Sequence, residues 1–235
     1  MSRGRGIRRV CFAALLVAVG MAMWLKWFIV SGGHPVMSGL RCVVIDPGHG
    51  GEDPGAVGKR GVLEKDVVLN VSLELARLLQ RAGIEVVLTR TTDVELGQET
   101  GAGWKVGDLS ARVRTANSCR ADIFISVHAN ADVYTYCRGA QVFYRADVNK
   151  DSERLARALQ SEIARICKNT DREVSSNINQ YVLKSVKMPA ATVEIGFLSN
   201  PEEEALLASP DYQAKMAWAI CSGILKYFRE SSQPR

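Results

Sequence analysis

Short runs of mainly apolar residues recur along the chain and predict buried strands. The first run ends abruptly at Asp46-Pro47-Gly48, a combination that stops a strand and turns the backbone. The expected strands cover residues 41–45, 85–89, 123–127, 140–144 and 191–195.

Between these runs, apolar residues fall at spacings of three and four, as on the buried face of a helix. Val67, Val71 and Leu75 share such a face, and Gly83 marks the end of that helix. The expected helices cover residues 63–81, 108–119, 151–167, 201–207 and 212–228. Strands that alternate with helices predict one α/β domain, with a mixed, mostly parallel twisted sheet of about six strands and helices on both faces.

Two stretches are less regular. Residues 91–107 are rich in glycine, threonine and acidic residues and predict a surface loop, with Asp108 as the N-cap of the following helix. A second irregular region leads to the apolar segment 181–183. The sequence shows no internal repeat and no low-complexity tract.

The N-terminal segment predicts a membrane anchor. Four arginines precede a charge-free run over residues 10–25, which is followed by Lys26 and the apolar residues 27–30. This run is long for a signal-peptide core, and its positive flank would remain in the cytoplasm, placing the rest of the chain outside. Cleavage at Ala18-Val19-Gly20 is the alternative, and a buried helix of the domain is disfavoured by the one-sided charge.

These patterns divide the chain into four parts: a signal-anchor at 1–30, a linker at 31–39, the α/β domain at 40–230 and a tail at 231–235. The linker contains three glycines and a proline, together with His34, which is expected to be solvated.

The charge and the cysteine content narrow the class of protein further. The formal net charge of +5 comes from the first 30 residues, which hold five basic and no acidic groups, so the remainder is neutral. A basic surface for nucleic acid is therefore not indicated. Outside Cys11 the five other cysteines are widely spaced, without a C-x-x-C pair, and are expected to be mainly small core residues; one disulfide is possible but not predicted.

Polar side chains follow three of the expected strands. His49 lies on a glycine-rich turn after the first, His128 follows the third, and Glu194 closes the strand at 191–195. Glu64 opens the first helix. Because ligands collect at the carboxyl ends of strands in an open α/β sheet, these groups can converge although they are distant in sequence.

Two histidines and one carboxylate, with a fourth position open to water, are the usual ligands of catalytic zinc. A second carboxylate must remain outside the metal shell to accept a proton, and Glu64 and Glu194 could divide these two roles. Each residue has a simpler explanation: Glu64 could complement the helix dipole, and His128 could be a hydrogen-bonded core residue. Glu194 is harder to explain in this way, because a carboxylate among apolar neighbours is costly to bury unpaired.

At this point the residues resemble a known family, the type 3 zinc-dependent N-acetylmuramoyl-L-alanine amidases of bacterial peptidoglycan. The likeness covers about residues 41–228. Four blocks carry it: Ile45-Asp46-Pro47-Gly48-His49-Gly50-Gly51, Leu63-Glu64-Lys65-Asp66, Ser126-Val127-His128-Ala129-Asn130 and Val193-Glu194-Ile195-Gly196-Phe197-Leu198-Ser199-Asn200.

The resemblance implies one Zn²⁺ per chain, with His49, Glu64 and His128 as ligands and Glu194 as the catalytic carboxylate. The implied reaction is hydrolysis of the amide between the lactyl group of N-acetylmuramic acid and L-alanine. Arg90, Asn117 and Asn130 lie near strand or helix ends and are expected to support the glycan or the ligands.

Within the family, the chain looks most like the germination-specific branch, which trims stem peptides from spore cortex on the way to muramic-δ-lactam. The single N-terminal anchor and the ending Gly223-Ile224-Leu225-Lys226-Tyr227-Phe228 support this placement. The enzyme would then act at the extracytoplasmic face of the membrane, or exported if cleaved, in the forespore. Only residues 129–138 separate His128 from the next strand, so no inhibitory helix is expected there.

Several alternatives stay open. The chain could be a general vegetative wall amidase, or a different zinc hydrolase such as a peptidase or a deacetylase of wall sugars. It could also be a non-catalytic wall-binding protein, although the presence of all four site residues argues against this. A phosphate-binding loop is disfavoured because no Lys-Ser/Thr follows Gly51. Whether a protein activator is needed cannot be read from the pattern.

Overall fold

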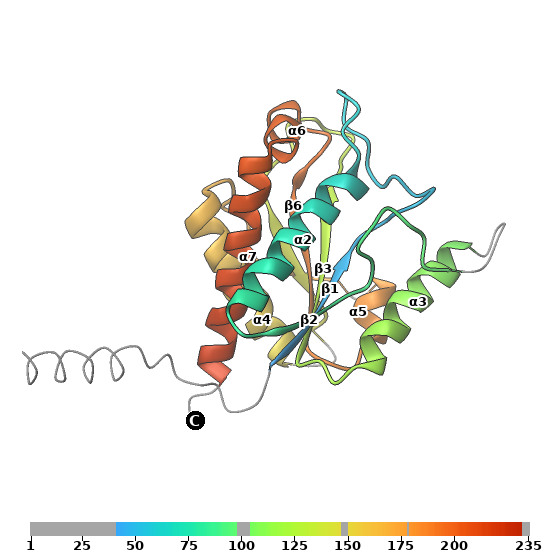
Figure 1. Ribbon diagram of the computed structural model, residues 1–235. Coiled ribbons are helices and arrows are strands. Elements are labelled where there is room, and N and C mark those ends of the chain that lie inside the picture. Colours follow the sequence, from blue (N-terminus) through green and yellow to red (C-terminus); the bar gives the residue numbers. More distant parts are fainter. Residues whose placement is uncertain (1–40, 98–103, 147–149, 178, 232–235) are drawn as a thin grey trace, which may run out of the picture. The chain divides into compact units, whose positions relative to one another are not determined.

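The computed structural model describes residues 41–97, 104–146, 150–177 and 179–231 (Figure 1). Its centre is a six-stranded sheet in the order β2-β1-β3-β6-β4-β5. Neighbouring strands run parallel, except that β4 is antiparallel to β6. The strands are β1 (Cys42–Pro47), β2 (Glu85–Leu88), β3 (Ile123–Asn130), β4 (Gln141–Tyr144), β5 (Ser175–Ser176) and β6 (Ala190–Phe197).

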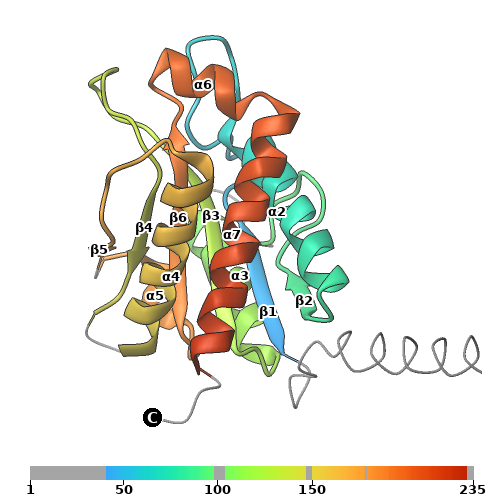
Figure 2. The same cartoon turned by 90° about the vertical axis from the view of Figure 1, so that its left-hand side faces the viewer.

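Helices cover both faces of this sheet, as Figures 1 and 2 show. On one face lie α2 (Glu64–Arg81), α4 (Lys150–Cys167) and α7 (Pro210–Ser231). On the other lie α3 (Trp104–Ser118) and α5 (Tyr181–Ser185), while α6 (Pro201–Leu207) follows β6 at one end of the sheet. The expected α/β domain with a mostly parallel sheet of six strands is confirmed.

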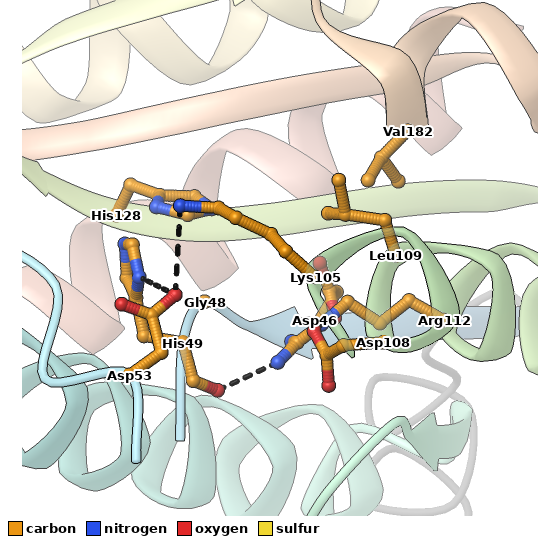
Figure 3. Close-up of a pocket in the computed structure, with 10 residues that line it drawn as sticks. All are labelled: Asp46, Gly48, His49, Asp53, Lys105, Asp108, Leu109, Arg112, His128 and Val182. Carbon is orange, nitrogen blue, oxygen red and sulfur yellow. Dashed lines mark hydrogen bonds and ion pairs between the residues drawn. The ribbon is translucent and has the colours of Figure 1, made fainter. Parts of the chain in front are cut away.

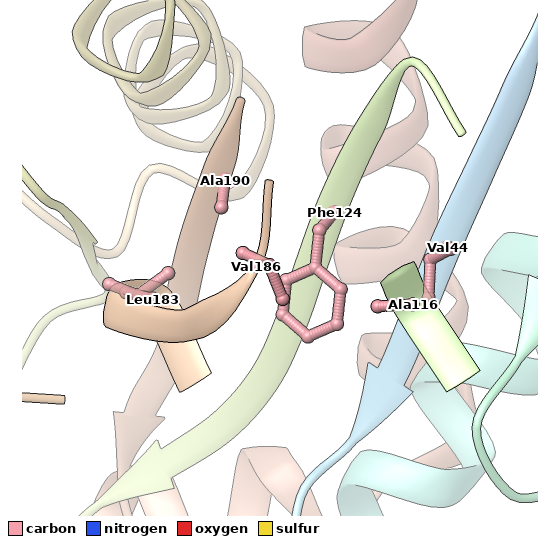
Figure 4. Close-up of a cluster of buried hydrophobic side chains, with 6 residues drawn as sticks. All are labelled: Val44, Ala116, Phe124, Leu183, Val186 and Ala190. Carbon is pink, nitrogen blue, oxygen red and sulfur yellow. The ribbon is translucent and has the colours of Figure 1, made fainter. Parts of the chain in front are cut away.

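Complete burial explains why the central strands are nearly continuous in apolar residues. Every residue of β1 is buried, since helices cover the sheet from both sides. On the face of α3 and α5, Val44, Phe124 and Ala190 from three neighbouring strands pack against Ala116 and Leu183 (Figure 4). The four larger side chains of this cluster, Val44, Phe124, Leu183 and Val186, each contribute about 1.5–3 kcal/mol by burial and fix these two helices on the sheet.

The opposite face depends on close helix packing. A Cβ atom at Gly223 of α7 would lie 2.7 Å from the Cα atom of Leu159 in α4, so only glycine allows these backbones to approach so closely. Leu155, Leu159 and Ile163 follow the expected helical spacing on α4 and are fully buried beneath this contact.

Two sequence-based expectations were wrong in detail: the loop expected over residues 91–107 ends before Trp104, and Asp108 does not cap the helix that follows. Helix α3 begins at Trp104, so Asp108 lies inside the helix. There its carboxylate accepts hydrogen bonds from the Leu96 amide and the Arg112 guanidinium. The segment 181–183 belongs to the short helix α5, and the two-residue strand β5 was missed because two serines carry no strand pattern.

Other expectations concern residues or bonds that can be checked only in part. The anchor at 1–30, the linker and most of the tail lie outside the described residues. None of the helices in the described part of the chain combines the length and the apolar character needed to cross a bilayer. All five cysteines of the described domain are free thiols, and three of them, Cys42, Cys167 and Cys221, are buried.

Candidate metal centre

Three neighbouring strands place their side chains in ordered rows on the face of α3 and α5. Strand register pairs Asp46 with Ser126 and Ser126 with Thr192, so these polar residues form one row beyond the apolar row of Val44. Two residues further along, His128 pairs with Glu194. Towards the carboxyl ends of the parallel strands, this face therefore carries first a row of apolar side chains, then a row of polar side chains, and finally the ionisable side chains His128 and Glu194.

The middle row is a buried ionic network. Asp46 accepts hydrogen bonds from Thr89 (2.7 Å), Arg112 (2.8 Å) and Ser126 (2.8 Å). Burial alone would raise the pKa of Asp46, but the Arg112 charge and these three hydrogen bonds lower it below its usual range. Arg112 also binds Asp108, so one buried guanidinium joins α3 to β1.

The same network holds the turn that carries His49. Arg112 donates to the carbonyls of Pro47 and His49, both at 2.6 Å, and Arg90 donates to the carbonyl of Gly48 at 2.7 Å. His49 has a φ of 59°, in the left-handed region that a residue with a Cβ atom adopts only at a cost. The two guanidiniums therefore stabilise a strained turn that aims the imidazole.

Replacing Arg112 by methionine should destabilise the fold strongly. The substitution leaves the Asp46 carboxylate buried without its cation, which costs about 3–5 kcal/mol of unfolding free energy at neutral pH. Because the pKa of Asp46 is lowered in the folded state, this contribution is present above the ordinary carboxyl pKa and is lost as the pH falls through the lowered value. Urea unfolding at neutral and acidic pH measures both effects.

Arg157→Met is the matched control. Arg157 pairs with Glu153 on the exposed side of α4, where solvent screens the pair, so its loss should leave the unfolding free energy nearly unchanged. Equal destabilisation by the two substitutions would contradict a structural role for the Asp46–Arg112 pair.

Three of the side chains singled out by the sequence meet at the end of this face. Glu64 Oε1 lies 3.1 Å from His49 Nε2 and 3.0 Å from His128 Nδ1. One ligand atom from each residue falls within 4.8 Å of the other two. Glu194 lies outside this group, on the neighbouring strand in register with His128. The structure therefore separates one carboxylate inside the cluster from one beside it.

Further contacts fix each member of the cluster. His49 Nδ1 bonds the Asp53 carboxylate at 2.8 Å, which leaves Nε2 facing Glu64. The Glu64 carboxylate accepts from the backbone amides of Ala56 (2.8 Å) and Ala129 (2.9 Å). These bonds hold the cluster in place before any ligand arrives.

Two glycines allow this close packing. A Cβ atom at Gly48 would lie 2.3–2.7 Å from three atoms of the His128 ring. One at Gly55, whose φ is 67°, would lie 2.5 Å from Glu64 Oε2 and 2.7 Å from the His49 ring. Any larger residue at either position would displace a member of the cluster.

The protonation properties of the cluster favour a cation. Burial would raise the pKa of Glu64, but hydrogen bonds from His128 and His49 hold it well below its usual range. Burial would lower the pKa of His128, yet its hydrogen bond to Glu64 and the charges of Glu64 and Glu194 raise it to about 8. The cluster thus favours positive charge at His128.

The pKa of Glu194 is shifted in the opposite direction to that of Glu64. Burial, reinforced by the charge of Glu64, raises the pKa of Glu194 to about 7, although the nearby histidines act against this shift. Its Oε2 atom is buried and accepts no hydrogen bond from the residues that the structure describes. A carboxylate with these properties can both accept and return a proton near neutral pH.

A pocket of about 150 Å³ opens beside His49 and His128 (Figure 3). Asp53 and Lys105 lie at its polar end, with Asp53 Oδ2 4.0 Å from Lys105 Nζ. Leu109 and Val182 line its apolar side. The pocket gives a bound molecule access to the cluster from the side of α3 and α5.

The three residues expected to assist substrate or ligands occupy different places. Arg90 is buried and donates only to backbone carbonyls among its described contacts, so it supports the His49 turn. Asn117 lies near the far end of α3, where its amide bonds the backbone of Ser185 and Lys187. Asn130 ends β3 at the site edge, and its side chain accepts from the Ala131 amide. Glycan contact by these residues stays a prediction.

Sequence reasoning missed Asp53, Asp46 and Arg112. Asp53 carried a weak signal, since it follows His49 by four residues in the same loop. Arg112 carried none, because it is one of several arginines on a helix and only the fold places it beneath the His49 turn.

Two imidazoles and one carboxylate near the carboxyl ends of parallel strands, joined by Glu64 at the start of α2, define a protein with a catalytic site suited to one divalent cation. Comparison with known proteins identifies which kind. Residues 43–226 match the family model described as N-acetylmuramoyl-L-alanine amidase, so the chain belongs to this family of hydrolases acting on peptidoglycan.

Individual relatives agree with this placement. The chain is 39% identical to the germination-specific N-acetylmuramoyl-L-alanine amidase of Bacillus subtilis, over 90% of this chain and 86% of that protein. It is 32% identical to the amidase AmiA of Escherichia coli, over 81% and 77% of the two chains. Among solved structures, the CwlD amidase from Clostridioides difficile in complex with the GerS lipoprotein matches with a TM-score of 0.78 and 37% identity, covering 81% of this chain and 99% of that one.

Proposed function

We propose that the chain uses one zinc ion, held by His49, Glu64 and His128, to hydrolyse the amide between the lactyl group of N-acetylmuramic acid and L-alanine. The observation that carries this proposal is the convergence of one ligand atom from each of these residues within 4.8 Å, next to Glu194. The family supplies the bond that is cleaved.

The donor set suits zinc. Two imidazole nitrogens and one carboxylate oxygen, with a further position left for water or substrate, are typical of catalytic zinc sites. The bond between His49 Nδ1 and Asp53 is the kind of contact that orients a metal-binding histidine and raises its basicity. The raised pKa of His128, which reflects the negative charge of Glu64 and Glu194 around it, supports the same assignment.

When bound, zinc supplies a Lewis acid for the lactyl carbonyl and lowers the pKa of water to about 7. Glu194 then takes the proton from the attacking water and returns it to the departing alanine nitrogen. The second transfer matters as much as the first, because an amine leaves an amide poorly unless it is protonated. The raised pKa of Glu194, about 7, suits both transfers.

The biological setting follows from the relatives. The chain is similar to the germination-specific amidase of Bacillus subtilis and to the CwlD amidase of Clostridioides difficile. This similarity supports removal of stem peptides from spore cortex as the role of the chain. Cell-wall amidases are extracytoplasmic. The N-terminal segment 1–30 would keep the enzyme at the outer face of the membrane, in the forespore.

A protein partner is part of this proposal. The CwlD amidase was solved in complex with the GerS lipoprotein, so a protein partner fits this chain as well, and we propose that such a partner activates it. Comparing the activity of the purified chain alone with its activity in a spore extract would show whether it needs such an activator.

Replacing Asp53 by alanine should weaken zinc binding by about 10- to 100-fold, because the His49 ring loses the group that orients it. Competition with a coloured zinc chelator measures the affinity, and amide hydrolysis at limiting zinc should fall in parallel. Glu52→Gln removes a neighbouring exposed carboxylate and should change neither value. An unchanged affinity in Asp53→Ala would exclude Asp53 from the site.

Product analysis tests the proposed reaction. Incubation of the full-length protein with peptidoglycan, followed by mass analysis, should reveal new amino groups on L-alanine, no acetate and intact bonds within the stem peptides. Release of acetate would indicate a sugar deacetylase, and cleavage within the peptide would indicate a peptidase. Spore cortex and vegetative wall, offered side by side, distinguish the germination role from a general one.

A further inference from the structure

The connection between β3 and β4 exposes two tyrosines that have no role in the amidase reaction as described above. Tyr134 is 58% exposed and Tyr136 is 73% exposed. Their rings stack with centroids 5.3 Å apart and planes inclined by 25°, which leaves the outer ring faces open to solvent. This connection contains turns and no helix over residues 131–140, in agreement with the expected lack of an inhibitory helix.

Hydrogen bonds to the turn after β6 hold the loop that carries the two rings, at its start and between the two tyrosines. The Asp132 amide donates to Ser199 Oγ at 3.0 Å, and the Asn200 side chain donates to the Thr135 carbonyl at 2.9 Å. Within the loop, the Cys137 amide donates to the Tyr134 carbonyl at 3.1 Å. The exposed rings are therefore presented in a defined position, so binding to them costs little ordering.

The position of the loop links it to the catalytic strands. It begins directly after β3, which carries His128, and its bonds to Ser199 and Asn200 attach it to the turn after β6, which carries Glu194. In Figure 2 this yellow-green loop stands out beside α6, at the carboxyl ends of β3 and β6. A polymer bound at the cluster can therefore continue over the two rings.

We propose that Tyr134 and Tyr136 form a binding platform for a sugar ring of the glycan strand, next to the muramic acid whose amide is cleaved. This inference rests on the proposed function, which supplies a long glycan as the substrate. Aromatic faces carry partial negative charge and attract the C–H groups that line one side of a pyranose ring. The two phenol groups can also donate hydrogen bonds to sugar hydroxyls.

The size of the surface favours a sugar over a protein. Two tyrosine side chains offer at most about 500 Å², whereas each partner in a stable protein interface buries about 800 Å². The neighbouring surface is polar: Arg138 and Glu202 form an exposed ion pair there, 3.8 Å apart. Val133 is the one exposed large apolar side chain beside the rings on this described loop.

Kinetics on two substrates test the platform. Tyr134→Ala/Tyr136→Ala should raise KM for polymeric peptidoglycan about tenfold and leave kcat nearly unchanged. On a single muramoyl peptide without neighbouring sugars, both constants should match the wild type. Tyr134→Phe/Tyr136→Phe retains the rings and should recover most of the lost affinity. Trp218→Ala, which removes an exposed ring from α7, is the control and should leave KM and kcat unchanged on both substrates.

A binding assay separates this inference from the proposed function. Glycan strands freed of stem peptides should be retained by Glu194→Gln protein and about tenfold less by the same protein with both tyrosines replaced by alanine. This readout needs no hydrolysis, so it decides the platform even if the amidase reaction fails. Equal retention, an unchanged KM on the polymer, or equal losses on both substrates would overturn the proposal; equal retention would make a protein partner the occupant.

Discussion

Replacing Glu194 by glutamine is expected to lower amide hydrolysis by about 10²- to 10⁴-fold while the protein keeps its zinc. Glutamine has nearly the same shape and retains an oxygen acceptor, but it cannot take a proton from water or return one to the alanine nitrogen. Because Glu194 lies beside the three-residue cluster and not within it, the metal ligands are untouched. Release of L-alanine-terminated peptide from a muramoyl peptide, together with metal analysis of the same sample, measures both properties.

Glu202→Gln is the matched control for this experiment. Glu202 lies on the turn that opens α6, and its side chain is 83% exposed, so loss of its charge should leave turnover unchanged. Wild-type turnover in the Glu194 variant would remove Glu194 from the proton-transfer role. Loss of zinc from it would instead place this carboxylate among the ligands.

Replacing His49 is expected to remove the metal itself and to reduce activity to the level of the metal-free protein. In the proposed site His49 would supply one of the three ligand atoms, and the remaining imidazole and carboxylate would form an incomplete zinc site. Metal analysis of purified His49→Ala should find almost no zinc, and added zinc should not restore hydrolysis.

A second substitution separates metal loss from backbone strain. His49 has a left-handed backbone conformation, which alanine adopts poorly and asparagine tolerates better. His49→Asn should therefore fold more stably than His49→Ala in urea unfolding, yet bind zinc equally poorly. His34→Ala changes the one histidine of the chain outside the proposed site, which is expected in the linker, and should retain both zinc and activity. Full zinc content in both His49 variants would contradict the assignment.

The fold was predictable because its signals are local. Apolar runs marked the strands, since a parallel sheet covered on both faces requires continuous hydrophobicity, and spacings of three and four marked the long helices. The start of α3 was not predictable, because Gly107 and the polar residues before it favour a loop locally while the helix extends back to Trp104. Tertiary contacts decided this boundary.

The candidate site was predictable for a different reason. His49 follows β1, and His128 and Glu194 lie near the carboxyl ends of β3 and β6; the topology of a parallel sheet brings such positions to one edge. The structure brings His49, Glu64 and His128 together as expected. The supporting residues were hidden, because the pairing of Asp46 with Arg112 joins positions separated by 66 residues and leaves no periodic signal.

Zinc dependence of the reaction on a single muramoyl peptide tests the central claim most directly. The full-length protein should contain about one zinc per chain when purified and should release the alanine-terminated peptide. Removal of the metal with a chelator should abolish this release, and added zinc should restore it. Amide hydrolysis that continues in demonstrably metal-free protein would contradict the account, as would zinc that stays bound after His49 and His128 are both replaced.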